Sequence, residues 1–281
     1  MNAMNSEIAQ LVTLASAANG VISGCFDSAA LYPSDTYFRF CNSVRFVDVK
    51  KWPLMKLREV ERHGDPNEWL RSLAATHAVQ AWLSYTPTLN PLAPDHMVAA
   101  FVGGGGEWKL VVSTQRMTET WMPRWEANRR DASDRRVWRV TYGCVARLAR
   151  PIRVPTPDLE LAASRLLSAL TAAHEFASVH SLGFWADWFR GAADCLHRTM
   201  PVAFPKGSDL LCLESYPDIA QRLLAAAYSA WVFGGMGSWN DLAFEPAADN
   251  ARYSKLSREL YSAVTDAIQQ SSWSFRMTRA A

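Results

Sequence analysis

Histidine, cysteine and acidic side chains are the groups of this chain that could do chemistry, and their spacing limits what they can do. His174 and His180 are six residues apart in a segment of helical character, with Glu175 beside the first. Two histidines that chelate zinc from one helix stand four residues apart, whereas a spacing of six turns them about 240° away from each other. Cys195 and His197 are also poorly spaced, and no CxxC pair supports them. We therefore expect neither a metal site nor a cofactor.

A nucleophilic centre has no local signature either. The chain contains no GxSxG elbow. Cys25 has no neighbouring base in the sequence, and cysteine reactivity depends on an electropositive site that lowers the thiol pKa. Acidic residues in aromatic-rich segments are candidates for general acid work because such surroundings raise a carboxyl pKa; they are Glu107, Glu175, Asp187 and Glu214. No two of them form an obvious pair, so a catalytic site would have to be assembled from distant residues.

Arginine is concentrated in one part of the chain. There are 23 arginines and six lysines, and ten of the arginines lie within residues 114–153 beside four acidic residues. This segment therefore carries a charge of +6, although the whole chain carries only +2. Guanidinium groups bind carboxylates and phosphates in bidentate fashion, so the segment could face an acidic partner. The candidate partner-binding residues there are Trp121, Trp125, Arg129, Arg130, Arg135 and Arg136.

Two other interpretations of this arginine-rich segment remain open. The first is a solvated hairpin in which arginines pair with aspartates of the same region, as charge runs on protein surfaces usually do. The second is nucleic-acid binding, with tryptophans as stacking surfaces. Nucleic-acid binding ranks last, because the net charge is close to zero and no groove-reading motif occurs.

The most distinctive local string is FGGMGSWND, at residues 233–241. Three glycines in four residues end a helix and permit positive φ, while short polar side chains can hold a tight connection through hydrogen bonds. Trp239 would anchor such a loop. The string is not a dinucleotide fingerprint, because the last glycine of GxGxxG is missing and a helix precedes it. The residues predicted to bind a partner or to structure the loop are Gly235, Gly237, Ser238, Trp239, Asn240 and Asp241.

This string carries a family resemblance. Residues 230–241, followed by YSKLSRELY at residues 253–261, resemble bacterial proteins encoded beside polymorphic or contact-dependent toxins, which are presumed immunity proteins. The resemblance is confined to the C-terminal part of the chain and implies a function class without a mechanism. It implies a cytoplasmic protein that neutralises a cognate toxin by protein–protein contact. The alternative is a hydrolase-like enzyme with a site in the cleft between the two halves described below.

The cysteine pattern and the hydropathy of the chain indicate the cellular compartment of the protein. The five cysteines are odd in number and scattered, which favours reduced thiols in a cytoplasmic protein, with each thiol buried as a small hydrophobe. Residues 1–20 carry no lysine or arginine before their apolar stretch, unlike a signal peptide. No segment reaches the ~18–20 uninterrupted apolar residues that a membrane span requires. We therefore expect a cytoplasmic protein without a membrane span; its oligomeric state stays open.

The elements that position these residues divide the chain into two halves. In residues 1–150, periodicity predicts a helix over about residues 6–18 capped by Gly20. It also predicts a second helix that starts at Asp65-Pro66, presents His77 on its apolar face and fades before Pro87. Alternation of apolar and polar residues predicts strand structure over residues 36–49, with a break at Asn42-Ser43. It also predicts a hairpin, whose strands at 98–102 and 107–112 are joined by Gly103–Gly106, and a long strand over 135–148.

A proline-dense connector at residues 150–157 leads into a half made of helices. We expect them at about residues 157–180, 183–196, 217–233 and 250–269. Strands followed by helices predict an α+β fold, in which an antiparallel sheet of the N-terminal half packs with the helical C-terminal half. Residues 1–150 and 151–281 would be two units or one continuous domain.

Overall fold

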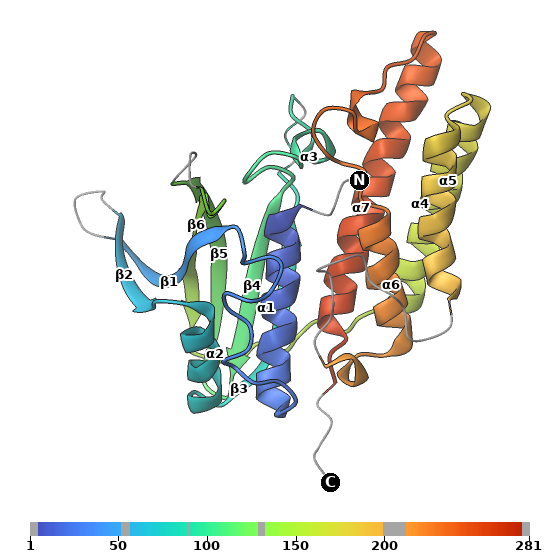
Figure 1. Cartoon of the computed structure of the whole chain (residues 1–281). Helices are drawn as coiled ribbons and strands as arrows, with labels where there is room; N and C mark the ends of the chain where they lie inside the picture. The colour runs from blue at the N-terminus through green and yellow to red at the C-terminus, as the bar shows by residue number, and fades with distance from the viewer. Residues whose placement is uncertain are drawn as a thin grey trace.

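A computed structural model describes residues 5–51, 57–88, 90, 92–128, 133–198 and 212–276 (Figure 1). The fold is α+β, as predicted, with a six-stranded sheet in the N-terminal half and helices in the C-terminal half. In chain order the elements are α1 (Ser6–Ser23), β1 (Cys41–Lys51), β2 (Leu57–His63), α2 (Pro66–Ala75), β3 (Ala78–Thr86), α3 (Asp95–Val98), β4 (Glu107–Thr114), β5 (Thr118–Ala127), β6 (Trp138–Leu148), α4 (Leu159–Val179), α5 (Gly183–Asp194), η1 (Cys195–His197), η2 (Leu213–Ser215), α6 (Asp218–Ser229), η3 (Trp239–Asp241) and α7 (Ala247–Trp273).

The strands of the sheet lie in the order β2-β1-β6-β5-β4-β3. All neighbours are antiparallel except β1 and β6, which are parallel and place Phe46 beside Tyr142. Phe46 is stacked between Tyr142 and Trp69 of α2, with ring centroids 5.0 and 4.7 Å apart. Aromatic stacking thus fixes α2 on the β1–β6 part of the sheet.

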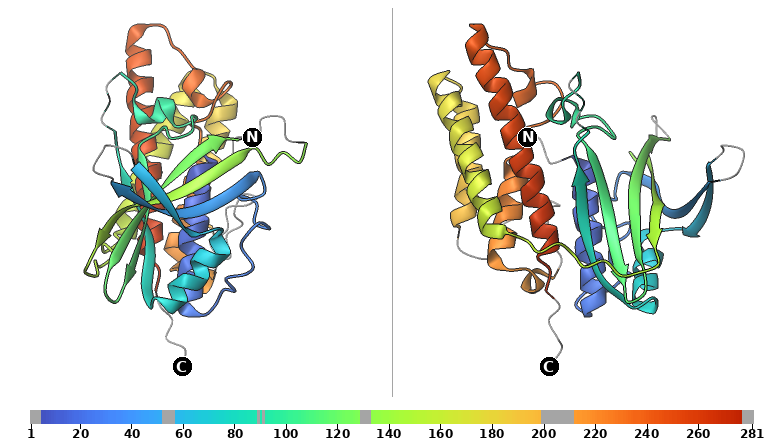
Figure 2. Two further views of the ribbon diagram at one scale, coloured as in Figure 1. Left: turned by 90° about the vertical axis from the view of Figure 1, so that its left-hand side faces the viewer. Right: turned by 180° about the vertical axis from the view of Figure 1, so that it is seen from behind.

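Helix α1 is buried on all sides between Ile8 and Gly20, because it lies between the sheet and the C-terminal helices (Figures 1 and 2). Its buried polar side chains are therefore bonded. Gln10 accepts from the Tyr142 hydroxyl at 2.7 Å, and Asn19 exchanges two bonds of 2.8 Å with the backbone of Ala81. The helix ends at Gly24, so the prediction of Gly20 as its cap was wrong.

Helix α7 covers the β3 edge of the sheet. The Ser272 hydroxyl accepts from Leu83 N at 3.0 Å, Gln269 accepts from Tyr85 N at 2.6 Å, and the Trp273 indole donates to Leu83 O at 2.8 Å. These side chains satisfy backbone groups that an edge strand leaves open. One hydrophobic core runs through both halves of the chain, and whether residues 1–150 and 151–281 count as separate units stays a prediction.

Several sequence predictions about elements were wrong. The helix starting at Asp65 ends at Ala75, and His77 lies outside it with φ 51°, followed by strand β3. Strand β1 begins at Cys41 rather than at residue 36, and its pairing with β6 shifts register between Cys41 and Ser43, where the sequence predicted an irregularity. Residues 98–102 form no strand, so the hairpin around the glycines does not exist; β4 pairs with β3 and β5 instead. Helix α6 ends at Ser229, ahead of the glycines.

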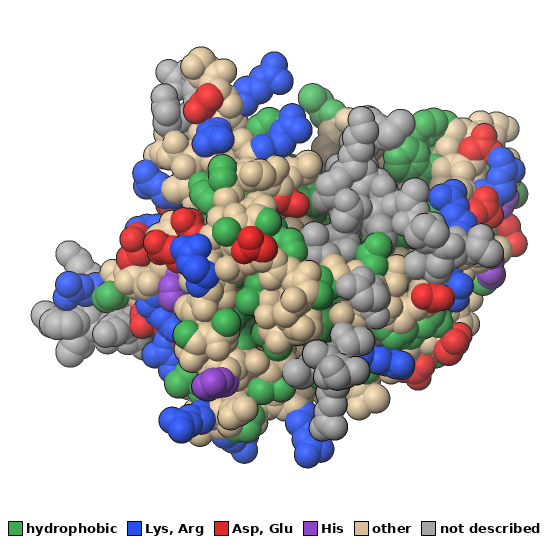
Figure 3. Space-filling view, turned by 60° about the horizontal axis from the view of Figure 1, so that its bottom comes forward, with side chains coloured by type: hydrophobic (Ala, Val, Ile, Leu, Met, Phe, Trp, Pro, Cys, Tyr) green, Lys and Arg blue, Asp and Glu red, His purple; other side chains and the backbone are tan. Residues whose placement is uncertain are grey.

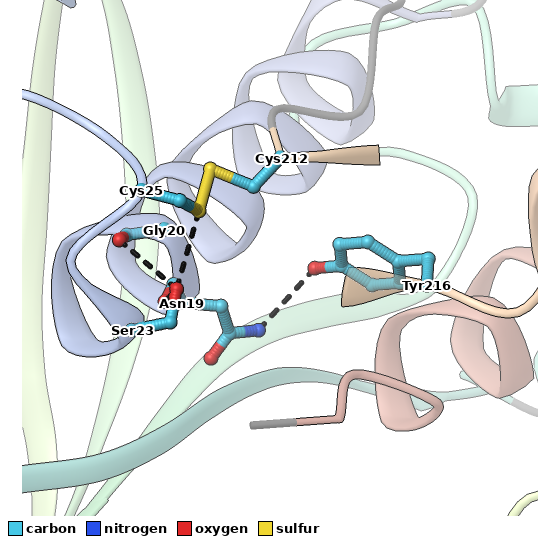
Figure 4. The surroundings of a disulfide bond; sticks show 6 residues. All are labelled: Asn19, Gly20, Ser23, Cys25, Cys212 and Tyr216. Carbon is cyan, nitrogen blue, oxygen red and sulfur yellow. Dashed lines mark hydrogen bonds between the residues drawn. A yellow bond between two sulfur atoms is a disulfide. The ribbon is translucent and has the colours of Figure 1, made fainter. Parts of the chain in front are cut away.

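The expectation of five reduced thiols was also wrong. Cys25, just after α1, is bonded to Cys212, just before η2, across a sequence separation of 187 (Figure 4). The bond joins the first helix of the strand-rich half to the entrance of α6. Cys41, Cys144 and Cys195 are free and buried as expected, and burial raises the pKa of the Cys41 and Cys144 thiols to about 11. Among the helices that the structure describes, none is long and apolar enough to cross a membrane.

Candidate partner-binding surface

The loop at residues 235–241 is held in shape by its own side chains. The Asp241 carboxylate accepts from the backbone N–H groups of Gly237 and Ser238. The Ser238 hydroxyl donates to Gly234 O at 3.1 Å and accepts from Asn240 N at 3.3 Å. These bonds form a capping box at the start of η3. The polar residues of the string therefore fix one loop conformation.

Trp239 anchors this loop in the core, as its sequence suggested. Its side chain is fully buried, and its indole N–H donates to the Ser257 hydroxyl of α7 at 2.8 Å. The Phe189 ring of α5 meets it edge-on at 4.9 Å. The Tyr253 hydroxyl donates to the Trp239 carbonyl. Contacts from α5 and α7 thus hold the tryptophan in place, so the loop cannot shift without disturbing the packing of these two helices.

Asn240 ties the loop to a second surface segment. Its side-chain amide donates to the carbonyl of His96 in α3 at 2.7 Å. The segment that follows α3 is in turn bonded to the start of α1, where Asn5 donates to Ala99 O at 2.9 Å and Glu7 accepts from Gly103 N at 3.2 Å. Three segments that are distant in sequence are therefore fixed to one another at one end of the molecule.

Two of these segments carry exposed apolar side chains. Met236 is fully exposed at the tip of the loop, and Met97, Phe101 and Val102 expose 43, 67 and 50% of their surface. We call these four residues the apical patch, because both segments lie at the upper end of the molecule in Figures 1 and 2. Grouped apolar side chains on a protein surface mark interaction sites more often than scattered ones do. The apical patch is therefore a candidate contact surface.

A cavity of about 450 Å³ opens beside the apical patch, between the strand-rich half and α7. Asp95 lines it and accepts from the Tyr85 hydroxyl at 2.9 Å and from Thr88 N at 3.1 Å. Tyr261 lies across from them and donates to the Gly105 carbonyl. Burial raises the pKa of both tyrosines, most strongly for Tyr85. Both phenols are therefore neutral hydrogen-bonding groups at ordinary pH.

His96 and Arg258 complete the polar lining of this cavity. Burial lowers the pKa of His96, and the positive charge of Arg258 lowers it further, so the imidazole is neutral at pH 7. The arrangement brings a carboxylate, an imidazole and a guanidinium together between the two halves, where the sequence had placed the alternative enzyme site. Cys25 is not among the lining residues and is bonded to Cys212, which leaves no thiol for the nucleophile considered from sequence.

The other candidates from the arginine-rich segment fall into three groups. Trp121 is fully buried against Phe46, so it cannot meet a partner, and its selection as an interface residue was wrong. Trp125 is half-buried, Arg135 is exposed and Arg136 is half-buried, all on the β5–β6 hairpin. Arg129 and Arg130 lie outside the described residues. The structure therefore keeps the hairpin residues as candidates and removes Trp121.

Part of the arginine excess is neutralised within the sheet. Arg147 contacts Asp48 and Glu119, each at 2.9 Å, and Arg62 contacts Glu119 at 2.8 Å and Asp48 at 3.3 Å. These four residues come from β1, β2, β5 and β6. Glu119 lies opposite Arg147 in the β5–β6 hairpin, which is the kind of internal pairing that the solvated-hairpin interpretation describes. Asp48 and Arg62 come from β1 and β2, so their part in the cluster could not be seen in the sequence of the hairpin.

A second group of paired arginines lies on β1, β2 and β5. Glu59 accepts from Arg124 at 2.6 Å and from Arg45 at 3.0 Å, and the bond from Arg124 lowers the pKa of Glu59. On the face shown in Figure 3, acidic side chains lie among the cationic ones at the left and right, whereas cationic side chains along the lower edge have no acidic neighbour on view. The paired arginines are therefore not free to attract an acidic partner.

Comparison with protein-family models, with curated proteins and with solved structures returns no match.

Proposed function

We propose that this protein is an immunity-type protein that neutralises a cognate bacterial toxin by binding it through the apical patch and the loop at residues 235–241. One observation carries the proposal: the loop is locked from below by Trp239 and Asn240, yet it holds Met236 fully exposed at its tip. A fixed loop that presents an apolar side chain loses little conformational entropy on binding, which favours affinity. The resemblance of residues 230–241 to immunity-type proteins supplies the class of partner.

The neighbouring apolar residues support the same function. Phe101 and Val102 extend the exposed apolar area beyond Met236, and the bond between Asn240 and His96 fixes the two segments relative to each other. Binding hot spots combine such apolar or aromatic anchors with a rim that excludes water. The apical patch therefore offers a compact contact surface built on a rigid scaffold.

Co-expression tests the proposal. The toxin-like product of the neighbouring gene is expressed in bacteria with wild-type protein, with Met236→Asp or with Leu161→Asp, which changes an exposed leucine at the start of α4. Wild type and Leu161→Asp are expected to restore growth, and Met236→Asp is expected to fail at equal protein levels. A toxin that kills cells despite wild-type protein, and that does not co-purify with it, contradicts the proposal.

The cytoplasmic location belongs to this proposal and needs its own test. It rested on reduced thiols, and the Cys25–Cys212 bond withdraws that argument, because disulfides persist mainly in oxidising compartments. Alkylation of free thiols in acid-quenched cells, read by mass spectrometry, decides the point. A cytoplasmic protein is expected to show labelled Cys25 and Cys212, and an unlabelled pair places the protein in an oxidising compartment.

The cavity beside Asp95 favours a second candidate function, a hydrolase-like enzyme. Its lining joins a carboxylate, an imidazole and two tyrosine hydroxyls in a concave site between the halves, which is where enzyme sites are commonly built. The test is turnover of generic ester and phosphoester substrates by purified protein, with Asp95→Asn as the matched variant. Activity that disappears in Asp95→Asn supports the enzyme, and equal rates in both proteins reject it.

A further inference from the structure

Three arginines near the β5–β6 hairpin differ from the four carboxylate-paired arginines of the sheet. Arg45, Arg62, Arg124 and Arg147 all contact carboxylates. Arg39, Arg135 and Arg136 form no ion pair with any residue that the structure describes. Three cations without a carboxylate partner among the described residues therefore lie where the hairpin meets the segment preceding β1. Arg58, Arg116, Arg139, Arg150 and Arg153 likewise form no ion pair with a described residue, so the neighbouring side chains must distinguish this place.

Arg39 lies against an aromatic side chain, and a tryptophan begins the neighbouring strand. Phe40 is 40% exposed, and the guanidinium of Arg39 lies over its ring at 4.6 Å. Trp138 is half-buried at the start of β6, and its backbone N–H donates to the Phe40 carbonyl at 3.2 Å. We call Arg39, Phe40, Arg135, Arg136 and Trp138 the hairpin rim. Arginine and large aromatic residues are the types that contribute most to protein interfaces.

Hydrogen bonds attach the segment that precedes β1, which carries Arg39 and Phe40, to helices of the core. Gln10 of α1 donates to the Tyr37 carbonyl at 3.0 Å, and Asn67 of α2 holds both the N–H and the carbonyl of Tyr32, at 3.0 and 2.8 Å. Burial raises the pKa of Tyr32 and the nearby positive charge of Arg136 opposes that rise, which places Arg136 close to this segment. The segment that carries Arg39 and Phe40 is therefore preorganised.

We propose that the hairpin rim is a docking surface for an acidic face of a partner protein, which under the function proposed above is the toxin. Guanidinium groups without internal partners form bidentate, charge-assisted bonds with carboxylates. In the left view of Figure 2 the hairpin end projects to one side of the sheet and the apical patch lies toward the other, so the rim is a contact surface separate from the patch. Since the rim itself combines arginines with aromatic side chains, we expect the contact surface of the partner to carry both apolar residues and acidic residues.

A protein partner fits the rim better than a nucleic acid does. The cations of the rim are few and discrete, and acidic residues interrupt them: Asp134 accepts from Arg136 N at 3.1 Å, and Glu126 is paired with Arg124. A nucleic-acid site requires a continuous cationic track along the phosphates. The partly exposed ring of Phe40 instead suits a protein contact with an apolar component.

Two measurements test the rim. In the first, proteins are bound to immobilised poly-L-glutamate or to a DNA duplex over a range of salt concentrations. The variants are Arg135→Glu/Arg136→Glu, Arg39→Glu, and the control Arg153→Glu, which changes an exposed arginine of the same segment beyond the other end of β6. Wild type and Arg153→Glu are expected to bind poly-L-glutamate more tightly than DNA, and the rim variants are expected to lose at least tenfold in affinity. Equal losses in rim and control variants, or preference for DNA, overturn the proposal.

In the second measurement, the association rate with the purified toxin is followed for the same variants, alongside growth rescue. The rim variants are expected to associate at least tenfold more slowly at low salt and to show a flatter salt dependence than wild type, because charge complementarity acts mainly on the association rate. If wild type rescues growth and the rim variants associate at unchanged rates, the rim is not a docking surface, and the proposed immunity function is unaffected. If wild type fails to rescue growth but the rim variants still lose affinity for poly-L-glutamate, the immunity function is rejected and the rim remains a docking surface for acidic proteins.

Discussion

Two glycine-rich segments, residues 103–106 and 234–237, use glycine for different reasons. In the first, a Cβ on Gly105 would lie 2.9 Å from the Ala99 backbone, and one on Gly106 would lie 2.4 Å from the Tyr85 ring. In the second, a Cβ on Gly235 or Gly237 would meet no atom within 4 Å. Gly105 and Gly106 of the first segment therefore need glycine because they pack closely on the core, whereas Gly103 needs it only for its positive φ.

The second segment is attached to the rest of the protein on one side only. Trp239 and Ser238 hold it from below, whereas its outer side, with Met236, is open. Gly237 needs its glycine for a φ of +78°, but Gly235 has neither a positive φ nor a close neighbour. The fold of the isolated protein thus gives no reason for glycine at position 235. A partner that approaches the loop backbone closely would provide that reason.

Removing the support below the loop is expected to have the largest effect. Trp239→Ala deletes a fully buried indole and its bond to Ser257, and truncation of such a side chain costs about 3–5 kcal/mol of unfolding free energy. Chemical denaturation followed by circular dichroism measures the loss. A change below about 1 kcal/mol would show that the loop is not anchored in the core.

Gly105→Ala is expected to cost about 3 kcal/mol, because it combines positive φ with a clash against the Ala99 backbone. Gly103→Ala is the matched control: Gly103 also has positive φ, at +72°, but a methyl group added there would meet no atom within 4 Å. The control is expected to lose only about 1 kcal/mol. Equal losses in the two variants, measured by denaturation, would remove close packing as the reason for this glycine segment.

Gly237→Ala is expected to cost about 1 kcal/mol, from its positive φ alone. The hydrogen bonds of Asp241 to the loop backbone should survive, since the added methyl group meets open space. Differential scanning calorimetry on wild type and variant gives the difference. A loss as large as that of Gly105→Ala would contradict the contrast between the two segments.

Gly235→Ala is expected to have the smallest effect on folding. Without positive φ or close contacts, the substitution should change stability by less than about 0.5 kcal/mol, or raise it slightly by restricting the unfolded chain. Thermal melting measures this. A substantial destabilisation would mean that the fold itself requires glycine there, and that no partner needs to be invoked.

Local patterns explain most of what the sequence predicted correctly. Asp65-Pro66 gave the start of α2, and alternation gave β6, because both signals lie within a few residues. Strand β5 was missed since Pro123 lies inside it, and proline normally argues against a strand interior. Strand β3 was missed because the apolar run that begins at Ala78 directly continues the pattern of the preceding helix.

The candidate site was predictable only in part, for a related reason. Trp239 as an anchor and the polar caps of the loop follow from neighbouring residues. The bond from Asn240 to His96 joins residues 144 apart, and the Cys25–Cys212 pair spans a separation of 187. Pairing between residues so distant depends on the tertiary fold, and cysteine connectivity cannot be deduced from spacing. The apical patch likewise exists only once α3 and the loop are brought together.

Calorimetric titration of the purified toxin into wild type and Met236→Asp tests the central claim most directly. Met236 is fully exposed, so the substitution should leave the melting temperature unchanged. Burying a carboxylate in an apolar contact is costly, so we predict that affinity falls at least 100-fold. Equal affinity of the two proteins for the toxin would contradict the claim that this loop is the contact surface.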